Sequence, residues 1–251
     1  MSNLDSINIC FCSDKNLTRY IKVVIKSIQR SNPSYDFNFH IIRDFEQHED
    51  YDDLVEYIKK FSNLKLTEYK SEWSYEYKGM YHIPSSASML RILIPELINE
   101  DRILYLDVDL VVNIDIKELY QTNTGETGIA MVTDGAGDSG NTGVMVLDIK
   151  KLRENKFTKF CIEQNNKKPD CDGRIINKYL NKKYEILPSK YNVLQYVLNA
   201  RLSKLAKYNN NFIFHFTDRH KPWKYSENFK RRKKRRKFHF LWYSAKNYIH
   251  K

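Results

Sequence analysis

Two carboxylates separated by one residue close an aliphatic run in the middle of the chain. Residues 103–109 read ILYLDVD, so Asp107 and Asp109 end a segment with the composition of a buried strand. Side chains at positions i and i+2 of a strand point to the same side of its sheet. Two such carboxylates can bind a divalent cation, which can neutralise a diphosphate. The alternative is an aliphatic strand followed by a solvated acidic turn, and the flanking sequence favours the cation site.

The surrounding sequence alternates between short apolar runs and amphipathic stretches, which is typical of an α/β fold with a mostly parallel sheet. Strands are expected at residues 7–12, 37–42, 64–69, 103–109, 128–132, 143–147, 185–188 and 212–216, and helices at residues 17–31, 51–61, 89–98, 150–165 and 174–180. In such a sheet the ligand crevice lies at the carboxyl ends of the strands. The acidic pair therefore occupies the edge where a ligand is expected.

The composition fits one large domain with a short basic appendage. The chain has 251 residues, 41% of them from the AVILMFWYC set, and a formal charge of +11. Ten basic residues fall within residues 230–251, which contain no Asp or Glu, so the rest of the chain has 32 basic against 31 acidic residues. This near-neutral body argues against a nucleic-acid-binding protein. We expect one domain at residues 1–225 and a separate tail at residues 226–251.

The sequence favours a cytoplasmic location. The first residues are polar, and no segment approaches the roughly 20 apolar residues of a membrane-spanning helix. The four cysteines lack the spacing of a zinc site. We therefore expect reduced cysteines in a cytoplasmic protein.

Four segments, in order along the chain, resemble glycosyltransferase family 8. Residues 91–98 and 102–109 resemble the core around its acidic pair, and residues 141–152 (NTGVMVLDIKKL) resemble its Asn-x-Gly-Val segment with the following helix. Residues 215–223 (HFTDRHKPW) resemble its phosphate-binding motif. The resemblance implies a GT-A type fold, with a Rossmann-like, mostly parallel central sheet flanked by helices. It also implies a retaining enzyme that moves a hexose, galactose or glucose, from a UDP-sugar to a saccharide or glycolipid acceptor.

The resemblance adds a third metal ligand to the acidic pair. The imidazole of His215 would join Asp107 and Asp109, and a mixed oxygen and nitrogen ligand set favours Mn²⁺, with Mg²⁺ as the other choice. Lys221 would place a positive charge on the same diphosphate. The alternatives are a histidine hydrogen-bonded within the core and an ordinary surface lysine. Asp218 stands where the motif usually has Gly, and its carboxylate would repel a diphosphate unless it turns away or pairs with a cation.

The resemblance also assigns residues to the nucleotide. Cys12 and Asp14 would meet the uracil, with a small buried hydrophobe and a turn-forming aspartate as the respective alternatives. Leu17 replaces the tyrosine that often stacks on the base. Arg91 would lie close to the donor, as would Asp107, although a buried ion pair with an aspartate is the rival interpretation of Arg91.

The sugar end of the site departs most from the family. Asp134 and Asn141 would hydrogen-bond the transferred sugar, although Asn141 could instead be a turn residue. The family commonly has Asp-Gln-Asp before a late helix, and here Asp172 is kept while Gly173 and Arg174 replace the other two residues. A shifted register would instead use Asp170, Cys171 and Asp172, again without the Gln. Asp172 and Asp134 are the candidate catalytic carboxylates of a double displacement. Without the Gln, a front-face route becomes more attractive, and a catalytically weakened nucleotide-sugar-binding protein or a UDP-sugar hydrolase is the alternative function.

The tail combines a basic run with an aromatic segment. Residues 230–237 are all Lys or Arg. A helix after them would have one apolar face, made of Phe238, Leu241, Trp242, Ala245 and Ile249. This combination suits the headgroup region of an anionic membrane. We therefore predict that residues 230–251 bind the protein peripherally to the inner face of a membrane; nucleic-acid binding and a solvated tail without a partner are the alternatives.

Overall fold

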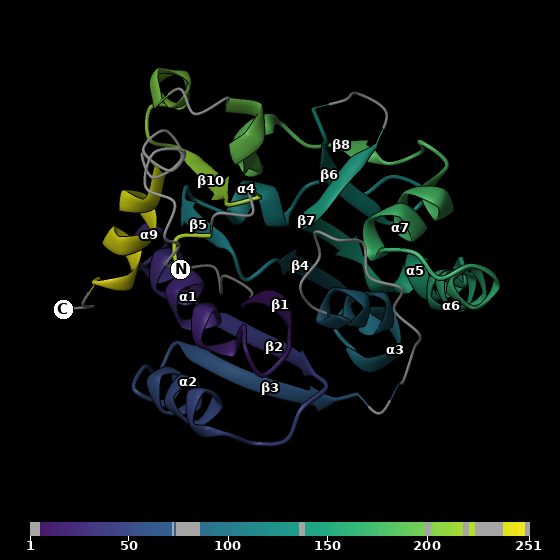
Figure 1. Ribbon diagram of the computed structural model, residues 1–251, viewed down its shortest axis with the longest axis horizontal. Helices are drawn as coiled ribbons and strands as arrows, with labels where there is room; N and C mark the ends of the chain where they lie inside the picture. The colour runs from purple at the N-terminus through teal and green to yellow at the C-terminus, as the bar shows by residue number, and fades with distance from the viewer. Residues whose placement is uncertain are drawn as a thin grey trace, which may run out of the picture.

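Seven strands form the central sheet of the computed structural model (Figure 1). The structure describes residues 6–71, 73, 86–135, 139–198, 202–217, 221–223 and 238–248. In their order across the sheet, the strands are β3 (Leu64–Lys70), β2 (Phe37–Arg43), β1 (Ile7–Ser13), β4 (Arg102–Leu106), β7 (Gly140–Asp148), β6 (Ile129–Thr133) and β8 (Glu185–Ile186). Strands β3, β2, β1 and β4 run parallel, whereas β7 is antiparallel to both of its neighbours. The predicted α/β fold with a mostly parallel sheet is confirmed.

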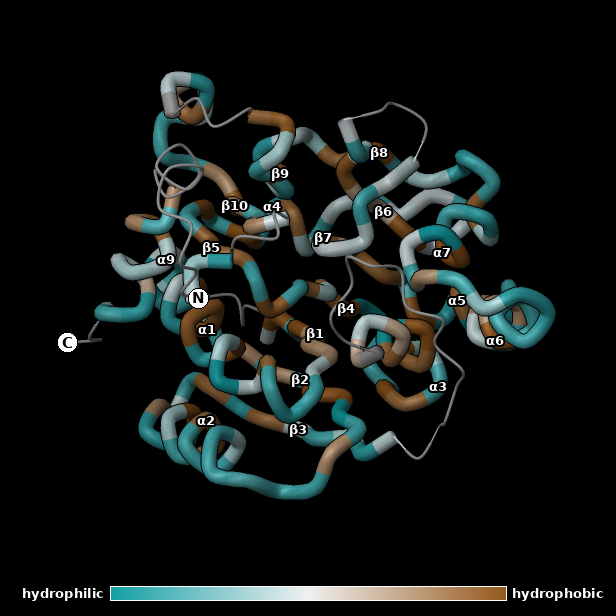
Figure 2. The backbone as a smooth tube through the Cα atoms, in the orientation of Figure 1, coloured by the Kyte–Doolittle hydropathy of each residue, from teal (hydrophilic) through white to brown (hydrophobic). Residues whose placement is uncertain are grey.

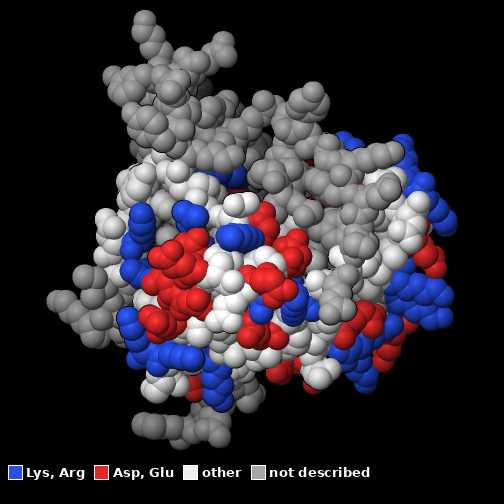
Figure 3. Space-filling view, turned by 60° about the horizontal axis from the view of Figure 1, so that its bottom comes forward, with Lys and Arg blue, Asp and Glu red and all other residues white. Residues whose placement is uncertain are grey.

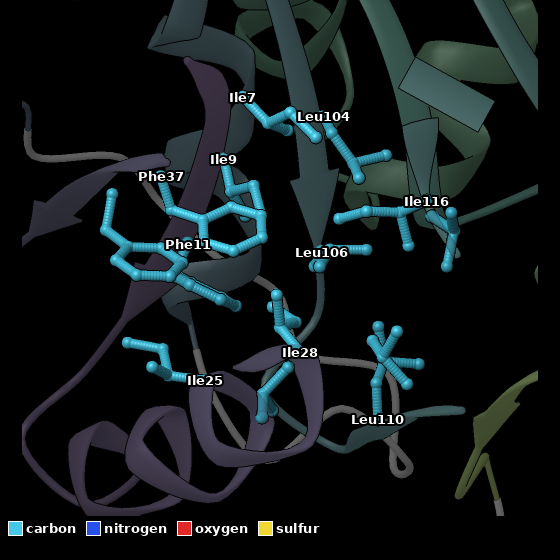
Figure 4. Close-up of a cluster of buried hydrophobic side chains, with 14 of the residues drawn as sticks. Ile7, Ile9, Phe11, Ile25, Ile28, Phe37, Leu104, Leu106, Leu110 and Ile116 are labelled. Atoms are coloured by element: carbon cyan, nitrogen blue, oxygen red, sulfur yellow. The ribbon is translucent and has the colours of Figure 1, made fainter. Parts of the chain in front are cut away.

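Helices cover both faces of this sheet. The described α-helices are α1 (Thr18–Ser31), α2 (Glu49–Lys59), α3 (Ile94–Leu97), α4 (Lys117–Tyr120), α5 (Ile149–Glu154), α6 (Phe157–Lys167), α7 (Asp172–Leu180) and α9 (His239–Lys246). The described 3₁₀ helices are η1 (Ser86–Leu93), η2 (Ser189–Tyr191), η3 (Gln195–Leu198) and η4 (Leu202–Tyr208). Side chains alternate along a strand. Ile9 and Phe11 of β1 therefore pack with α1 and α2 (Figure 4), whereas Cys10 and Cys12 pack with η1 on the other face.

The hydropathy of the chain follows this layering. Every residue of β1 is buried. Figure 2 shows the apolar strand segments in the interior and more hydrophilic segments on the outer sides of the helices. A strand that is covered on both faces has a continuous apolar sequence rather than an alternating one, which explains the run at residues 7–12.

A second, smaller sheet combines one strand from the middle of the chain with two strands from its last third. It consists of β5 (Leu110–Asn113), β10 (Phe212–His215) and β9 (Val193–Leu194), in that order. Strand β5 is antiparallel to β10, and β10 is parallel to β9. Because β5 begins four residues after β4 ends, this small sheet brings distant segments next to the carboxyl edge of the large one.

Several predicted elements differ from the observed ones. The helix predicted at residues 89–98 is the 3₁₀ helix η1 followed by the short helix α3, and the strand predicted at residues 185–188 ends at Ile186. The strand predicted at residues 103–109 ends at Leu106, because the chain bends at residues 107–109 to pass from the large sheet into the small one. The helix predicted at residues 150–165 is divided into α5 and α6, because Lys156 adopts a left-handed conformation with φ 55° between them. Both acidic residues therefore lie in a bend beyond the strand rather than on it.

Helix α9 packs against α1, at the left of Figure 1. Phe238, Trp242 and Ala245, three members of the predicted apolar face, are buried in a core cluster of the body. The face that was assigned to a membrane is thus largely covered by protein. Residues 230–237 and Ile249 lie outside the described residues. Among the residues that the structure describes, no helix combines the length and apolarity needed to cross a bilayer.

Charges of both signs share the described surface. On the face shown in Figure 3, groups of Lys or Arg side chains border groups of Asp or Glu side chains. Two ion pairs between α1 and α2 are of this kind, Lys22 with Asp53 at 2.7 Å and Arg19 with Asp50 at 3.0 Å. This mixture agrees with the near-neutral charge of the chain outside residues 230–251.

Candidate active site

Three side chains from distant parts of the sequence meet at the carboxyl edge of the central sheet. His215 Nε2 lies 3.1 Å from Asp109 Oδ1 and 3.6 Å from Asp107 Oδ2. One ligand atom from each residue lies within 4.8 Å of the others. The pairing of β5 with β10 holds them in place, because His215 stands opposite Leu110 and the Phe216 N–H donates to the Asp109 carbonyl at 3.0 Å. The structure thus brings the three predicted metal ligands together.

Gly143 of β7 lies directly against this cluster. A Cβ atom at this position would come within 2.2 Å of His215 Cε1 and 2.9 Å of Asp107 Oδ2. The Gly143 carbonyl accepts the Asp107 N–H at 2.8 Å. The three ligand groups can converge only because this position has no side chain. Two carboxylates and one imidazole form a suitable ligand set for a divalent ion such as Mn²⁺, so the residues present fit the cation.

Lys221 adds a positive charge beside the cluster. Its ammonium donates to Asp109 Oδ2 and to the Phe216 carbonyl. Burial by itself would raise the pKa of Asp109, but Lys221 and His215 outweigh burial and hold the pKa of this carboxyl well below its usual range. Asp109 is therefore ionised at neutral pH, as a metal ligand must be.

Arg91 of η1 is buried behind the acidic pair. Its guanidinium lies 2.8 Å from Asp107 Oδ1 and 3.2 Å from Asp172 Oδ2, and it donates to the Thr142 carbonyl at 2.8 Å. It also lies 4.5 Å from the centre of the Tyr105 ring. Burial opposes the charge of Arg91, but the two carboxylates outweigh it and raise the pKa of the guanidinium. The structure therefore contains the buried ion pair that was the rival interpretation of Arg91, and the same side chain also lines the cavity described below.

Asp172 begins α7 and is almost completely buried. Its Oδ2 accepts from the Thr142 hydroxyl at 3.2 Å in addition to its contact with Arg91. Gly173 follows it on the cavity wall, and a Cβ atom there would meet only Thr142 Oγ1, at an ordinary 3.6 Å. Arg174 points outward to Asp170, at 3.2 Å. The position of the missing Gln thus has room for a side chain.

Asp14 and Cys12 lie at the end of β1. Asp14 Oδ1 accepts from the Leu17 N–H at 2.8 Å, so this carboxylate shapes the turn before α1, which was its alternative role. Cys12 is buried with the core that packs against η1, as a small hydrophobe would be. Both residues nevertheless line the cavity, together with Leu17. The nucleotide roles of Cys12 and Asp14 remain predictions.

An aromatic stack anchors the residues after Lys221. Trp223 stacks on Tyr20 of α1, with ring centres 3.9 Å apart and an angle of 19° between the planes. The hydroxyl of Tyr243 in α9 donates to the Pro222 carbonyl at 2.9 Å. Helices α1 and α9 thereby fix the segment that carries Lys221. Asp218 lies outside the described residues.

A cavity of about 780 Å³ joins these features. All of the predicted site residues line it, namely Cys12, Asp14, Arg91, Asp107, Asp109, Asp134, Asn141, Asp172, His215 and Lys221. They come from β1, η1, β7, α7, β10 and the segments that follow β1, β4, β6 and β10. A volume of several hundred cubic ångströms is typical of a small-molecule site. The geometry is therefore compatible with a ligand as large as a nucleotide-sugar.

Sequence reasoning missed Asn192, which lies between η2 and β9. Its side chain contacts both His215, at 3.0 Å, and Asn141, at 2.8 Å. The Asn141 oxygen also accepts the Gly143 N–H at 3.0 Å, which is the turn-like role left open for this residue. No spacing pattern marks Asn192, because the three residues are linked only by the fold.

The model of glycosyl transferase family 8 matches residues 8–227. The chain belongs to this family. Glycosyltransferase GlyD of Streptococcus pneumoniae is 29% identical over 242 residues, which cover 86% of this chain and 28% of that protein. The lipopolysaccharide 1,3-galactosyltransferase of Salmonella typhimurium is 26% identical, with 88% of this chain and 74% of that protein covered. The chain spans only 28% of GlyD and 56% of the related GlyE.

Solved structures of similar proteins share the family 8 fold. The apo form of GlyE from Streptococcus pneumoniae superposes with a TM-score of 0.74 at 22% identity, covering 97% of this chain and 61% of that one. The galactosyltransferase LgtC in complex with donor and acceptor sugar analogs superposes with a TM-score of 0.69 at 20% identity, covering 97% of this chain and 98% of that one. The predicted family and GT-A type fold are thus confirmed.

Proposed function

We propose that this family 8 protein is a metal-dependent, retaining hexosyltransferase that uses a UDP-sugar donor and a saccharide or glycolipid acceptor. The observation that carries the proposal is the convergence of Asp107, Asp109 and His215 beside Lys221 on one cavity. Carboxylate and imidazole ligands next to a lysine suit a divalent cation with a bound diphosphate. Its relatives include lipopolysaccharide galactosyl- and glucosyltransferases, which supports galactose or glucose as the sugar.

The charges of the site suit departure of a nucleoside diphosphate. A bound Mn²⁺ or Mg²⁺ would act as a Lewis acid that stabilises the negative charge on the leaving phosphate. Asp107 and Asp109 offer ionised oxygens to the cation, and His215 offers a nitrogen. Lys221 supplies a further positive charge for the diphosphate. This charge stabilisation is larger in the transition state than in the ground state, which is the condition for rate acceleration.

The remaining lining residues divide between the two ends of the donor. Cys12 and Asp14 would contact the uracil, with Leu17 as an apolar neighbour of the ring. Asp134 and Asn141 would hydrogen-bond the transferred sugar. The cavity reaches both groups, which supports an extended donor.

The surroundings of Asp172 favour a front-face route over a double displacement. A nucleophilic carboxylate needs a reactive oxygen aimed at the anomeric carbon. The ion pair of Asp172 Oδ2 with Arg91 and its hydrogen bond with Thr142 hold this buried carboxylate in one orientation, and the positive charge of Arg91 lowers its nucleophilicity. We therefore propose that Asp172 orients sugar hydroxyls, while the leaving phosphate takes the proton of the acceptor. Asp134 remains the candidate nucleophile if a covalent intermediate forms.

Gly173 supports a second candidate function. The amide of the family's Gln is missing from this position, although a Cβ atom would fit there without a clash. Without this amide, the site could bind a UDP-sugar but transfer its hexose slowly, or transfer the hexose to water. The nucleotide-sugar-binding protein and the UDP-sugar hydrolase therefore stay as alternatives.

The membrane contact is proposed from residues at the surface of α9 and the basic run before it. Phe240 and Tyr243 are exposed on α9, at 55% and 47%. Residues 230–237 supply eight positive charges in the sequence. Each cation near an anionic surface contributes about 1 kcal/mol. We propose that this region holds the protein at the inner, cytoplasmic face of a membrane, where a glycolipid acceptor would lie.

A panel of UDP-sugars, assayed for UDP release with and without Mn²⁺, tests the function. Release that requires Mn²⁺ and one sugar is expected, with a further increase in the presence of the correct acceptor. Asp109→Ala should reduce the rate about 1,000-fold, because a ligand to a Lewis acid contributes several kcal/mol. Asp36→Ala removes an exposed carboxylate and is the control. Equal rates with and without Mn²⁺ would contradict the proposal.

A further inference from the structure

Asn192 is a buried amide that contacts the predicted metal ligand His215 from behind. Only 1% of Asn192 is exposed. Its Oδ1 lies 3.0 Å from His215 Nδ1, and its Nδ2 donates to Asn141 Oδ1 at 2.8 Å. The other nitrogen of the ring, Nε2, faces Asp107 and Asp109. Asn192 therefore acts on the nitrogen of His215 that does not face the acidic pair.

The direction of these hydrogen bonds is fixed by one backbone group. The orientation of an amide and the protonation of an imidazole normally have to be inferred from their partners. Here the Gly143 N–H, which can only donate, lies 3.0 Å from the side chain of Asn141 and identifies the atom there as oxygen. This oxygen can only accept, so Asn192 turns its NH₂ group toward it. The oxygen of Asn192 then faces His215 Nδ1, which must carry a hydrogen.

We propose that Asn192 is a positioning residue that keeps the proton of His215 on Nδ1 and so directs the free electron pair of Nε2 at the cation. The inference rests on the metal-dependent function proposed above. A neutral imidazole has one N–H and one free nitrogen, and only the free nitrogen can bind a metal. Partners of this kind set the orientation and basicity of metal-binding histidines in general.

The alternative hydrogen-bonding state of His215 shows why such a partner is needed. Nε2 lies 3.1 Å from Asp109 Oδ1, so a hydrogen on Nε2 would be well placed to donate to this carboxylate. That state would occupy both the ligand nitrogen and one ligand oxygen. Asn192 opposes it, because its oxygen would then face the lone pair of Nδ1. A half-turn of the Asn192 amide would not remove the cost of this state. Its NH₂ group would then face His215, and the hydrogen bond from Asn192 to the Asn141 oxygen would be broken.

Two substitutions of Asn192 separate the hydrogen-bond acceptor from the rest of the side chain. Asn192→Leu removes both the acceptor for His215 and the donor to Asn141. Asn192→Asp also removes the donor but keeps an oxygen that can accept from Nδ1. We expect Mn²⁺ affinity, measured by calorimetry without nucleotide, to fall about 10- to 100-fold in Asn192→Leu, the usual effect of losing such a partner. In Asn192→Asp the affinity should stay within about threefold of wild type.

Nuclear magnetic resonance can detect the hydrogen bond between His215 Nδ1 and Asn192 in protein without bound metal. In ¹⁵N-histidine-labelled, metal-free protein, the Nδ1–H of His215 should give a slowly exchanging signal in wild type and in Asn192→Asp, and lose it in Asn192→Leu. The signal is assigned by its absence in His215→Gln. A role in packing alone would lower stability without following this pattern.

Asn8 provides the matched control. It lies in β1 and, like Asn192, donates to one side chain and accepts from another, Tyr120 and Asn38. Asn8→Leu and Asn8→Asp should change stability while leaving the His215 signal and the Mn²⁺ affinity at wild-type values. If Asn192→Leu and Asn192→Asp weaken Mn²⁺ binding equally, or neither weakens it, the inference is overturned. A wild-type protein that shows the Nδ1–H signal but binds no Mn²⁺ overturns the proposed metal-dependent function instead.

Discussion

The two ends of the cavity are built from different interactions. At the metal end, Arg91, Asp107 and Asp172 form buried ion pairs, and Asp109 is held between Lys221 and His215. At the β1 end, Cys12 and Leu17 offer apolar surface, and the carboxylate of Asp14 accepts a hydrogen bond of 2.8 Å from the Leu17 N–H. Buried charges lose much free energy when one partner is removed, whereas apolar contacts change gradually with shape. Substitutions at the metal end should therefore have the larger effects.

Arg91→Met should have the largest effect on stability. It leaves Asp107 and Asp172 without their buried cation, and breaking such a pair costs about 3–5 kcal/mol. We expect the free energy of unfolding, measured with urea and circular dichroism, to fall by that amount. Arg174→Met breaks the exposed pair with Asp170 and should cost less than about 1 kcal/mol. If the free energy of unfolding fell equally in the two variants, the buried ion pairs of Arg91 would contribute no more to stability than the exposed pair of Arg174.

His40 of β2, the strand next to β1, predicts a pH dependence of stability. It is buried in β2, its Nδ1 lies 3.3 Å from the Tyr69 hydroxyl, and its Nε2 has no partner among the described residues. Burial lowers the pKa of His40 from 6.5 to about 4. The unfolded chain therefore binds a proton that the folded protein does not, so stability is complete above pH 6.5 and falls as the pH drops toward 4.

The loss attributable to His40 is about 3 kcal/mol over this range, since one pKa unit corresponds to about 1.4 kcal/mol. His40→Gln keeps a polar partner for Tyr69 and removes the titration. Urea unfolding at a series of pH values should show a much flatter stability curve for this variant. Parallel curves for wild type and His40→Gln would show that other groups cause the acid sensitivity.

Gly143→Ala tests the closeness of packing at the metal end. Its methyl group would meet His215 and Asp107, and overpacking of this kind costs about 1–3 kcal/mol. Mn²⁺ affinity should fall together with stability, because the displaced groups are the proposed ligands. Gly173→Ala lines the same cavity, but its methyl group would make only an ordinary contact with Thr142 Oγ1, and it should lower neither quantity. A normal Mn²⁺ affinity in Gly143→Ala would show that the ligands can move apart without loss.

Leu17→Tyr should produce the smallest change, and it acts at the β1 end. A tyrosine there could stack on the uracil, and aromatic stacking contributes about 0.5–1.5 kcal/mol. We expect the KM for the UDP-sugar to fall by about two- to tenfold with little change in kcat. Lys15→Tyr places the same ring on an exposed neighbour that does not line the cavity, and its KM should be unchanged. A higher KM in Leu17→Tyr would contradict the prediction that the uracil binds next to residue 17.

The sequence predicted the large sheet well where a parallel strand is a nearly continuous apolar run, as in β1 and β4, whereas β3 at the sheet edge alternates apolar and polar residues. Strand β1 is the clearest case, since all seven of its residues are buried. The small sheet was harder to predict, because β9 has only two residues and is defined by its partner β10. The packing of Trp242 against the body was also not foreseen. An apolar helix face has the same sequence whether protein or lipid covers it.

The site was predictable where local spacing carries the chemistry. Asp107 and Asp109 are separated by one residue, and their carboxylates lie close together although both residues are in a bend rather than a strand. His215 and Lys221 were recognised from one motif. Asn192 could not be found in this way, because its bonds to Asn141 and His215 arise only when β7, β9 and β10 come together. Side chains that support a ligand from behind have no fixed spacing from it.

The stack of Tyr20 on Trp223 also has a consequence for the order of biosynthesis. Tyr20 leaves the ribosome long before Trp223 is added, and strands β1 to β4 are complete well before His215 emerges. Domains generally fold as units. A nascent chain therefore cannot complete the cavity wall that carries Lys221 until Trp223 is available to pack on Tyr20.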